Sequence, residues 1–294
     1  MIITILSRLE TYLLRTSLKI KTHSILFSLC NAEGVSKLLG ETLRETFQND
    51  VTPEEKKWID RIELLREKLN SSGTEISILD YGAGKPGHNS IVGKTYGNNV
   101  ISKTIGEVCK RTSKSYFWSL ILFKLIRKFK PYICLELGTG LGISASYQAA
   151  ALALNGKGKI ITLEGSESLV SIAKQHFYTL GLDNAFIIPG KFQDTLDGVL
   201  ESNRSFGYVF IDGHHDEKAT LRYYQQVLPF LSNDAIMVFD DISWSKGMKR
   251  AWKNIIADER VKTSIDLWQM GICVIEHNKP SREDNDAPQF ENIK

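Results

Sequence analysis

The chain has 294 residues, of which 42% are hydrophobic and 24% are charged, with only seven prolines. A chain of this length and composition can bury a large core, so a disordered or fibrous protein is excluded. The 37 lysines and arginines against 34 aspartates and glutamates leave a net charge of +3, which does not support nucleic acid as a partner.

The cysteines lie far apart in apolar surroundings: Cys30, Cys109, Cys134 and Cys273. They form no CxxC pair and no cluster with histidine, so the sequence gives no sign of a metal knuckle. We expect free thiols in a reducing compartment, and therefore a cytoplasmic protein.

The N-terminus is predicted to form an amphipathic helix. Leucines recur there at helical spacing: Leu6, Leu9, Leu13 and Leu14. Charged residues interrupt the apolar run well before the roughly 20 residues that a transmembrane helix needs, so no span is expected. The helix either docks on the rest of the protein or a second copy, as in a homodimer, or makes peripheral contact with a membrane. The basic residues for a membrane contact would be Arg8, Arg15, Lys19 and Lys21.

The pattern stays helical from Lys37 to Asn70, and Thr52 before Pro53 is typical of a helix start. Residues 71–99 are rich in Gly, Asn, Ser and Lys and contain one strand-like run, Ile76–Tyr81. We expect residues 1–100 to form a helical N-terminal cap that ends in a glycine-rich lid loop.

After a helix predicted from Tyr116 to Lys130, short β-rich runs alternate with helical stretches. The runs are Ile133–Leu137, Lys159–Leu163, Ala185–Ile188, Tyr208–Ile211 and Ala235–Phe239. This alternation predicts an α/β fold with a Rossmann-like, doubly wound and mostly parallel sheet. The runs Ser264–Met270 and Ile272–Glu276, separated by Gly271, predict a C-terminal antiparallel hairpin. We expect a domain over residues 101–278 and a disordered polar tail over residues 279–294.

Two motifs in which glycines follow a strand compete for the role of a nucleotide-binding turn, Asp80–Gly84 and Glu136–Gly142. Further glycines and a proline follow the first motif, which is incompatible with the helix that such a turn opens. An Ala- and Leu-rich helical stretch, Ile143–Leu154, follows the second motif, and the next strand ends in an acid, Glu164. The second motif is therefore the predicted binding turn.

This turn is suited to a nucleoside. Gly138, Gly140 and Gly142 let the backbone approach a ligand, and the helix start offers free N–H groups to an anion. Glu164 can accept hydrogen bonds from both ribose hydroxyls. Ile143 stands where a dinucleotide fingerprint needs a glycine, so NAD is disfavoured.

Residues 132–278 resemble the class I S-adenosylmethionine (SAM)-dependent methyltransferases, which carry an acid before a glycine turn, a second-strand acid and a C-terminal hairpin. Within that superfamily the sequence is closest to small-molecule O-methyltransferases of the catechol and caffeoyl-CoA type. The matching segments are LELGTGLG at 135–142, TLEGS at 162–166, VFIDGHH at 209–215 and FDDISW at 239–244. The resemblance implies SAM as the cofactor. The predicted cofactor-binding residues are Glu136, Gly138, Thr139, Gly140, Gly142, Glu164, Gly165, Phe192, Gln193 and Asp212.

Three acids follow predicted strands. Asp212 follows the fourth strand, and Asp240 and Asp241 follow the fifth, so all lie at the edge where open α/β sheets bind ligands. Such oxygen ligands suit Mg²⁺, which would lower the pKa of an acceptor hydroxyl. In the resembling enzymes the matching positions bind the metal, with Asn in place of Asp241. Alternatively, Asp240 and Asp241 only cap the next helix.

His214 and His215 follow Asp212 directly. The position of His215 matches a lysine base in the catechol-type enzymes, and histidine can take a proton near neutral pH. We predict His215 and Asp212 as catalytic residues; the alternative for His215 is a salt bridge or a metal ligand. Trp244 and Tyr81 are candidate walls of the acceptor pocket.

The stretch from Lys103 to Lys130 is strongly basic, with Glu107 as its only acid. Its basic residues include Lys110, Arg111, Lys114, Lys124, Arg127 and Lys128. It is either a solvated helix face or a surface that draws an anionic acceptor, such as a phosphate-bearing or carboxylated glycan or lipid. Reversing the charge of Lys124, Arg127 and Lys128 would test whether this stretch draws such an acceptor.

Together these features predict a SAM-dependent O-methyltransferase of a small-molecule or glycan/lipid hydroxyl, assisted by Mg²⁺ and with the helical section over the acceptor. No Asn-Pro-Pro-Tyr run follows the fourth strand and no cysteine follows a proline, so nucleic-acid bases are not expected acceptors. Two alternatives remain. One is a metal-dependent hydroxylase-like enzyme, because relatives of cephalosporin hydroxylases look similar around FIDGHH and FDDISW. The other is a non-catalytic, cofactor-binding partner protein.

Overall fold

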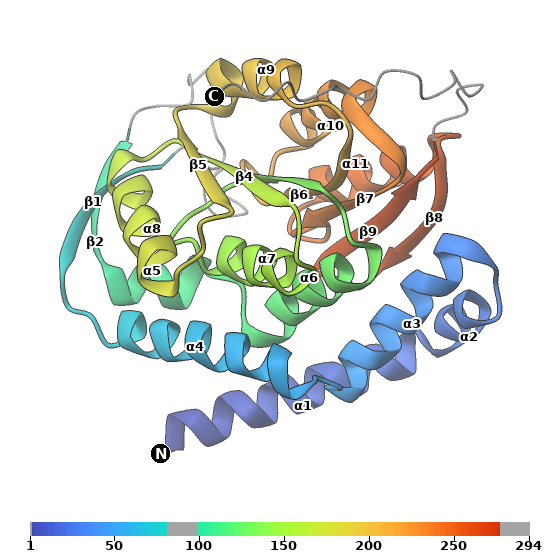
Figure 1. Cartoon of the computed structure of the whole chain (residues 1–294), viewed down its shortest axis with the longest axis horizontal. Coiled ribbons are helices and arrows are strands. Elements are labelled where there is room, and N and C mark those ends of the chain that lie inside the picture. Colours follow the sequence, from blue (N-terminus) through green and yellow to red (C-terminus); the bar gives the residue numbers. More distant parts are fainter. Residues whose placement is uncertain (1, 81–98, 277–294) are drawn as a thin grey trace, which may run out of the picture.

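The computed structural model of the chain describes residues 2–80 and 99–276. Its centre is a seven-stranded sheet in the order β5-β4-β3-β6-β7-β9-β8 (Figure 1). The strands are β3 (Ile133–Leu137), β4 (Lys159–Glu164), β5 (Ala185–Pro189), β6 (Phe206–Ile211), β7 (Leu231–Asp240), β8 (Val261–Asp266) and β9 (Met270–Ile275). Strands β3 to β7 pair in parallel, whereas β9 pairs antiparallel with β7 and β8. The predicted α/β fold is confirmed.

Helices cover both faces of this sheet (Figure 1). One layer consists of α6 (Tyr116–Phe129), α7 (Ile143–Leu154) and α8 (Glu167–Leu180), and the other of α9 (Phe192–Ser202), α10 (Glu217–Val227) and α11 (Lys246–Ile256). Along β6, Tyr208 and Phe210 belong to the core of the first layer, and Val209 and Ile211 to that of the second. Because both faces are buried, the central strands read as continuous apolar runs.

The strand order reverses between β3 and β6. From β3 the chain proceeds outward through β4 and β5, and it then crosses back to β6 and β7 on the other side of β3. The loops at the carboxyl ends of these parallel strands diverge at this point, which is where open α/β sheets form ligand sites. The fold therefore brings the predicted glycine turn and the predicted acids to one edge.

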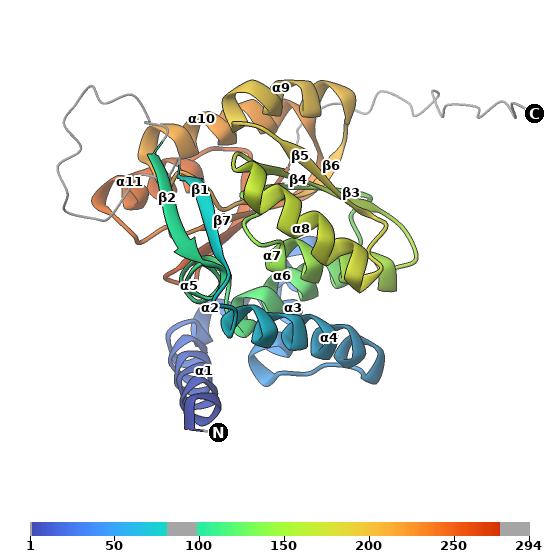
Figure 2. The same ribbon diagram turned by 90° about the vertical axis from the view of Figure 1, so that its left-hand side faces the viewer.

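The N-terminal section consists of α1 (Ile2–Lys21), α2 (His23–Cys30), α3 (Gly34–Gln48) and α4 (Pro53–Asn70). Helices α3 and α4 pack on α6 and α7: the ring of Phe47 stacks on that of Phe117, and the Tyr147 hydroxyl donates to Glu63 Oε1 at 2.7 Å. Helix α1 projects from one end of the molecule (Figure 2). None of the described helices combines the length and apolar character needed to cross a membrane.

Two features of α1 and α4 match the expectations from sequence. Leu18 of α1 is buried while Leu13 and Ile20 are exposed, as in an amphipathic helix that packs by one side. Thr52 caps α4, where its side chain and that of Glu55 form a reciprocal capping box. The predicted membrane and second-copy contacts of α1 remain untested.

A separate antiparallel pair, β1 (Glu75–Asp80) and β2 (Asn99–Thr104), leads into α5 (Ile105–Thr112). It is fixed against the start of α8, because Ser168 Oγ donates to the Ser77 carbonyl at 2.6 Å. The sequence indicated β1 but not β2. The predicted lid loop with Tyr81, and the tail over residues 279–294, lie outside the described residues.

The C-terminal hairpin is confirmed, but its turn lies elsewhere than predicted. The turn is formed by residues 267–269, and Gly271 is part of β9 rather than the connection. A Cβ at Gly271 would lie 2.8 Å from ring atoms of Trp252 on α11. The glycine is thus explained by close packing against an aromatic ring and not by a turn. A 3₁₀ turn, Leu228–Phe230, precedes β7, which begins before the predicted Ala235.

Candidate active site

A cavity of about 790 Å³ opens at the carboxyl edge of the sheet. Its walls come from the glycine turn after β3, the ends of β4 and β6, the start of α9, the segment between α5 and α6, and the β1–β2 pair. The predicted site residues that line it are Gly138, Thr139, Gly140, Glu164, Gly165, Phe192, Gln193, Asp212, His215 and Asp241. Trp244 also lines it, as predicted, whereas Glu136, Gly142 and Asp240 do not. Among the described side chains of α1–α4, Leu14 alone lines the cavity, and Ile78 and Leu79 of β1 line it from the same predicted N-terminal section. That this section covers the acceptor stays a prediction.

The glycine turn is shaped by contact with the loop after β6. Gly138 has φ 106°, and a Cβ there would lie 2.0 Å from the carbonyl oxygen of Asp212. Gly142 precedes α7 with φ 78°, and a Cβ there would crowd Ala173 and Phe177 of α8 at 3.1 and 3.0 Å. Gly138 therefore allows two loops of the site to meet, and Gly142 serves the packing of α7 on α8.

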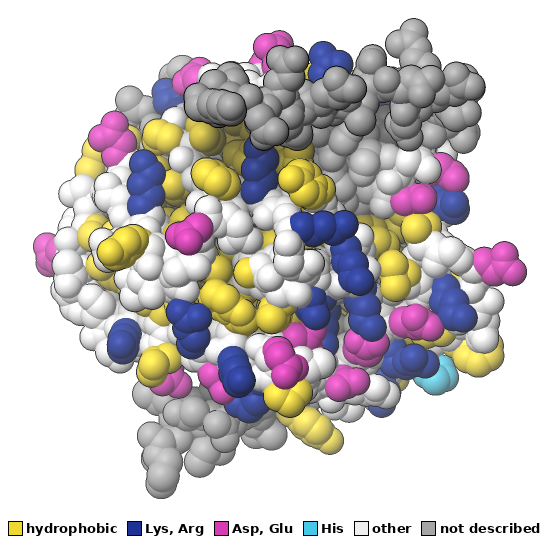
Figure 3. Space-filling view, viewed as in Figure 1, with side chains coloured by type: hydrophobic (Ala, Val, Ile, Leu, Met, Phe, Trp, Pro, Cys, Tyr) yellow, Lys and Arg dark blue, Asp and Glu magenta, His cyan; other side chains and the backbone are white. Residues whose placement is uncertain are grey.

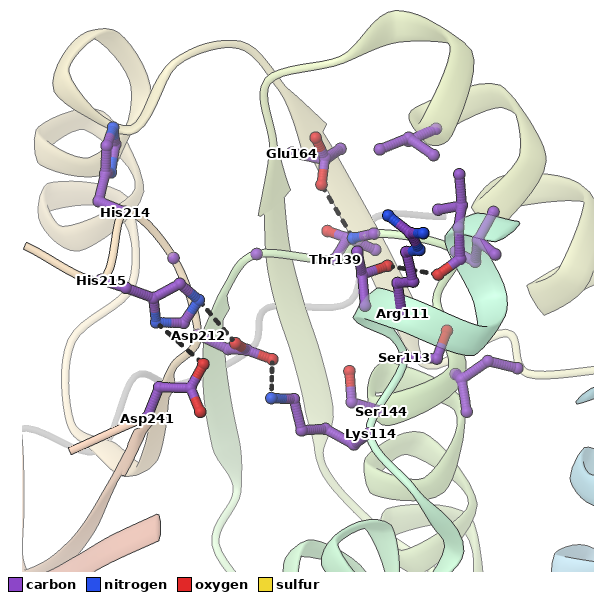
Figure 4. A pocket seen from close by; sticks show the side chains of 18 of the residues that line it. Arg111, Ser113, Lys114, Thr139, Ser144, Glu164, Asp212, His214, His215 and Asp241 are labelled. Carbon is purple, nitrogen blue, oxygen red and sulfur yellow. Dashed lines mark hydrogen bonds and ion pairs between the residues drawn. The ribbon is translucent and has the colours of Figure 1, made fainter. Parts of the chain in front are cut away.

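Glu164 closes the turn from the end of β4. Its carboxylate accepts the backbone N–H of Gly140 at 2.8 Å and that of Ser166 at 2.9 Å (Figure 4). Burial raises the pKa of Glu164, although these N–H groups oppose the shift. The same carboxylate lines the cavity, so it couples the shape of the turn to any ligand it binds.

Glu136 lies behind the turn and supports it. Its carboxylate accepts hydrogen bonds from Gln148 Nε2 at 2.8 Å and from the Thr162 hydroxyl at 2.7 Å. The Thr139 hydroxyl lies 2.7 Å from that of Thr162, so the chain of hydrogen bonds runs from the turn to Glu136. Burial raises the pKa of Glu136 to about 7. Its predicted contact with the cofactor stays a prediction.

An acidic cluster with a lysine in it lies at the ends of β6 and β7. Asp240 is fully buried, and Lys114 Nζ contacts its Oδ2 and lies 3.5 Å from Asp212 Oδ2. Lys114 comes from the segment between α5 and α6 and reaches toward Asp212 across the cavity (Figure 4). Burial lowers the pKa of Lys114, but the charges of Asp212 and Asp240 raise it more, so the side chain is an ammonium. The sequence places Lys114 in the basic stretch, but its pairing with these acids is evident only in the structure.

The predicted Mg²⁺ ligands do not fit a divalent cation while Lys114 is in this position. A cation bridging Asp212 Oδ2 and Asp240 Oδ2 would occupy the place of the ammonium. One ligand atom each from Asp212, His215 and Asp240 also come within 4.8 Å of one another, but this set includes the same two carboxylates. At about 4 Å and an effective dielectric constant of roughly 20, an ammonium and a divalent ion repel by on the order of 8 kcal/mol. The cation that neutralises these acids in the structure is therefore the Lys114 ammonium and not a metal ion.

His215 lies on the other side of Asp212 from Lys114 (Figure 4). Its Nε2 is 3.7 Å from Asp212 Oδ1 and its Nδ1 is 3.8 Å from Asp241 Oδ2. Burial lowers the pKa of His215, and the charges of Asp240 and Asp241 only partly offset this. The imidazole is consequently neutral near pH 7 and able to accept a proton. Its backbone is left-handed, with φ 44°, which is unusual for a side chain of this size.

His214 points away from the acids (Figure 4). Its Nδ1 lies 2.9 Å from the Tyr223 hydroxyl, and its ring packs edge-on against Phe192. Burial, with a contribution from Arg222, lowers the pKa of His214 to about 4. His214 therefore supports the start of α9, and His215 is the histidine directed at the acids.

Replacing His214 with glutamine should reduce the sensitivity of the fold to acid. Below the ordinary histidine pKa of about 6.5 the unfolded chain takes up a proton that the folded chain does not, so the stability contribution is complete above this pH and falls toward pH 4. Between about pH 7.5 and pH 5 the wild type should lose ~2 kcal/mol more than His214→Gln, as measured by urea unfolding. The exposed His23→Gln is the control. Equal losses in wild type and His214→Gln would contradict the assignment.

The three basic residues of α6 in the predicted basic surface do not face the cavity, whereas Arg111 and Lys114 of the same stretch line it. Lys124 Nζ donates to Glu55 Oε2 at 2.6 Å in the interior, and Arg127 Nε also donates to Glu55. Lys128 pairs with Glu45 at 2.6 Å. On the face shown in Figure 3, basic side chains are interspersed with acidic ones over the helical section. These basic residues of α6 thus fasten it to α3 and α4 and do not line the cavity.

Comparison with known proteins agrees with this geometry. Residues 135–242 match the protein-family model described as a methyltransferase domain. Over this segment the chain is therefore similar to methyltransferase domains. No curated protein matches the sequence significantly.

Solved structures of methyltransferases share the fold of the sheet-containing part of the chain. The SAH-bound methyltransferase PaMTH1 from Podospora anserina has 18% sequence identity and a TM-score of 0.51, over 57% of this chain and 81% of its own. The O-methyltransferase TomG from Streptomyces achromogenes, in complex with SAM, has 19% identity and a TM-score of 0.50, over 56% and 82%. A candidate O-methyltransferase from Klebsiella pneumoniae has 16% identity and a TM-score of 0.50, over 77% and 91%.

Proposed function

We propose that the protein is a SAM-dependent O-methyltransferase that acts on a hydroxyl of a small molecule. The observation that carries this proposal is one continuous cavity. It joins the glycine turn and Glu164 to the neutral His215 and the acids around it. A cofactor half and an acceptor half thus lie side by side at the carboxyl edge of the sheet, as transfer between two bound molecules requires.

The cofactor half would hold the nucleoside and the methionine part of SAM. Glu164 is placed to accept hydrogen bonds from ribose hydroxyls, with Thr139, Gly140 and Gly165 around it. Phe192 and Gln193, at the start of α9, would lie near the adenine, and the ring of Phe192 is held by His214 and Tyr223. When bound, SAM supplies a methyl group on a positively charged sulfur, so the protein itself contributes mainly positioning.

The acceptor half would activate a hydroxyl. His215 is the base in this proposal, because its imidazole is neutral and lies between Asp212 and Asp241, whose carboxylates stabilise the imidazolium once it carries the proton. Asp212 also joins the two halves, since its carbonyl contacts the glycine turn and its carboxylate faces His215. The proposal includes no Mg²⁺, because the Lys114 ammonium occupies the position between Asp212 and Asp240 that the ion would need.

The cofactor assignment is tested by calorimetric titration with S-adenosylhomocysteine. We expect binding by the wild type and an affinity loss of roughly 10- to 100-fold in Glu164→Ala, since hydrogen bonds to a charged group contribute about 1.5–3 kcal/mol. Glu167→Ala, three residues on and exposed at the start of α8, is the matched control and should bind like the wild type. A folded wild type that fails to bind S-adenosylhomocysteine would contradict the proposed function. It would also contradict the alternative of a non-catalytic protein that binds the cofactor.

Product mass separates the reaction classes once the cofactor binds. Methylation of an acceptor adds about 14 Da, oxygen insertion by a hydroxylase adds about 16 Da, and a non-catalytic partner gives no product. The structure favours methylation over a metal-dependent hydroxylase because Lys114 stands among the carboxylates that such an enzyme would use for its metal. A cytoplasmic location and a homodimer remain predictions.

A further inference from the structure

Lys114 is built into the wall of the cavity. The side chain is only 9% exposed, yet it lines the cavity beside Asp212 and His215. Its backbone carbonyl accepts a hydrogen bond from the Ser119 hydroxyl in the first turn of α6, which holds the segment in place. The ammonium therefore reaches the acids from a fixed position.

Within the described parts of the chain, the contacts of Lys114 leave one N–H donor for a ligand. An ammonium carries three N–H groups; one donates to Asp240, and a second can face Asp212 Oδ2, which forms an ion pair with Nζ at 3.5 Å. Lys124 of α6, the other buried lysine among the described residues, is instead held by Glu55 and does not line this cavity. Lys124 thus has a structural role only, whereas Lys114 presents its charge to the cavity in which an acceptor would bind.

We propose that the Lys114 ammonium is the resident cation of the acceptor site and replaces a divalent metal there, a proposal that rests on the proposed methyltransferase function. The acidic cluster holds the ammonium, and its remaining N–H binds the oxygen of the acceptor hydroxyl. The positive charge stabilises the oxygen as its proton leaves, which is the task of a metal ion at such a site.

The reaction balances without a further reagent. The acceptor oxygen forms a bond to the methyl carbon, and the carbon–sulfur bond breaks with its electron pair remaining on sulfur, which neutralises the sulfonium. The hydroxyl proton passes to His215, and Lys114 keeps its own protons throughout. His215 and Lys114, which lie on opposite sides of Asp212, thus act on the same oxygen as base and as fixed cation.

Manganese binding tests this proposal without knowledge of the acceptor. Mn²⁺ would be titrated into the full-length protein and followed by electron paramagnetic resonance of free Mn²⁺, with wild type, Lys114→Ala and Lys110→Ala compared. The exposed Lys110 on α5 is the control. We expect no saturable binding to wild type or Lys110→Ala, and at least about tenfold tighter binding to Lys114→Ala, because its carboxylates lose their cation. Asp240→Asn added to Lys114→Ala should remove that binding.

Tight Mn²⁺ binding by the wild type would overturn the proposal and restore the metal-assisted mechanism, whether or not the variant folds. A folded Lys114→Ala that binds Mn²⁺ no better than the wild type would also overturn it, since the acids would then form no cation site. S-adenosylhomocysteine titration of the same samples keeps the two proposals apart. Failure of that titration removes the methyltransferase function, whereas failure of the manganese result removes only the role of Lys114.

Discussion

Gly138→Ala is expected to abolish cofactor binding and to destabilise the fold by more than about 3 kcal/mol. The added Cβ would lie 2.0 Å from the carbonyl oxygen of Asp212, so the turn after β3 and the loop after β6 would have to separate. The left-handed backbone of Gly138, with φ 106°, adds to the cost. Both halves of the cavity depend on this contact. Thermal unfolding and titration with S-adenosylhomocysteine would measure the two effects.

Gly140→Ala is the matched control for this substitution. Gly140 is also left-handed, with φ 53°, but a Cβ there would meet no atom within 4 Å. The cost of Gly140→Ala is therefore that of the left-handed backbone alone, on the order of 1–2 kcal/mol. If Gly138→Ala and Gly140→Ala were equally stable, the close approach of the two loops would not be a constraint on the site.

Glu55→Ala should lower the free energy of unfolding by about 3–5 kcal/mol. Glu55 is almost fully buried and accepts hydrogen bonds from Lys124, Arg127 and the backbone N–H of Thr52. Burial raises the pKa of Glu55, but its partners lower it further, so the carboxylate is charged near pH 7. Removing it leaves Lys124 as a buried charge without its partner. Urea unfolding near pH 7 would measure the loss.

Asp60→Ala in the same helix provides the comparison. Asp60 pairs with Lys56 at 2.5 Å, but both side chains are more than 60% exposed. Such a surface pair contributes only about 0–1 kcal/mol. A loss for Glu55→Ala no larger than that for Asp60→Ala would mean that the ion pair between α4 and α6 does not stabilise the packing of the helical section on the α/β domain.

The main sheet could be predicted because its pattern is local. In the strands of the parallel core both faces are buried, so each is a short apolar run bounded by turn residues, and the glycine turn and the strand-end acids follow directly. β2 was missed because its alternation is weak in a polar stretch. The turn of the hairpin was misplaced because Gly271 is required by the ring of Trp252, which comes from another helix.

Part of the site could also be predicted from local sequence patterns. The residues that follow the strands were identified, since a parallel sheet brings the carboxyl ends of its strands to one edge. Glu164, Asp212 and His215 accordingly lie in the cavity. Contacts between segments distant in sequence were not predicted, because no local spacing encodes them.

The sequence by itself thus determined the fold class, the glycine turn after β3 and the acids at the edge of the sheet, all of which arise from short local patterns. Only the tertiary structure decided which basic side chain meets those acids. Lys114 pairs with Asp240 across 126 residues, and Lys124 pairs with Glu55 across 69. Both lysines lie in the same basic stretch of sequence, and packing sends one into the cavity and the other into the interface with α4. The physical reason is that a buried charge is stable only beside its partner, and the folded chain alone decides where that partner lies.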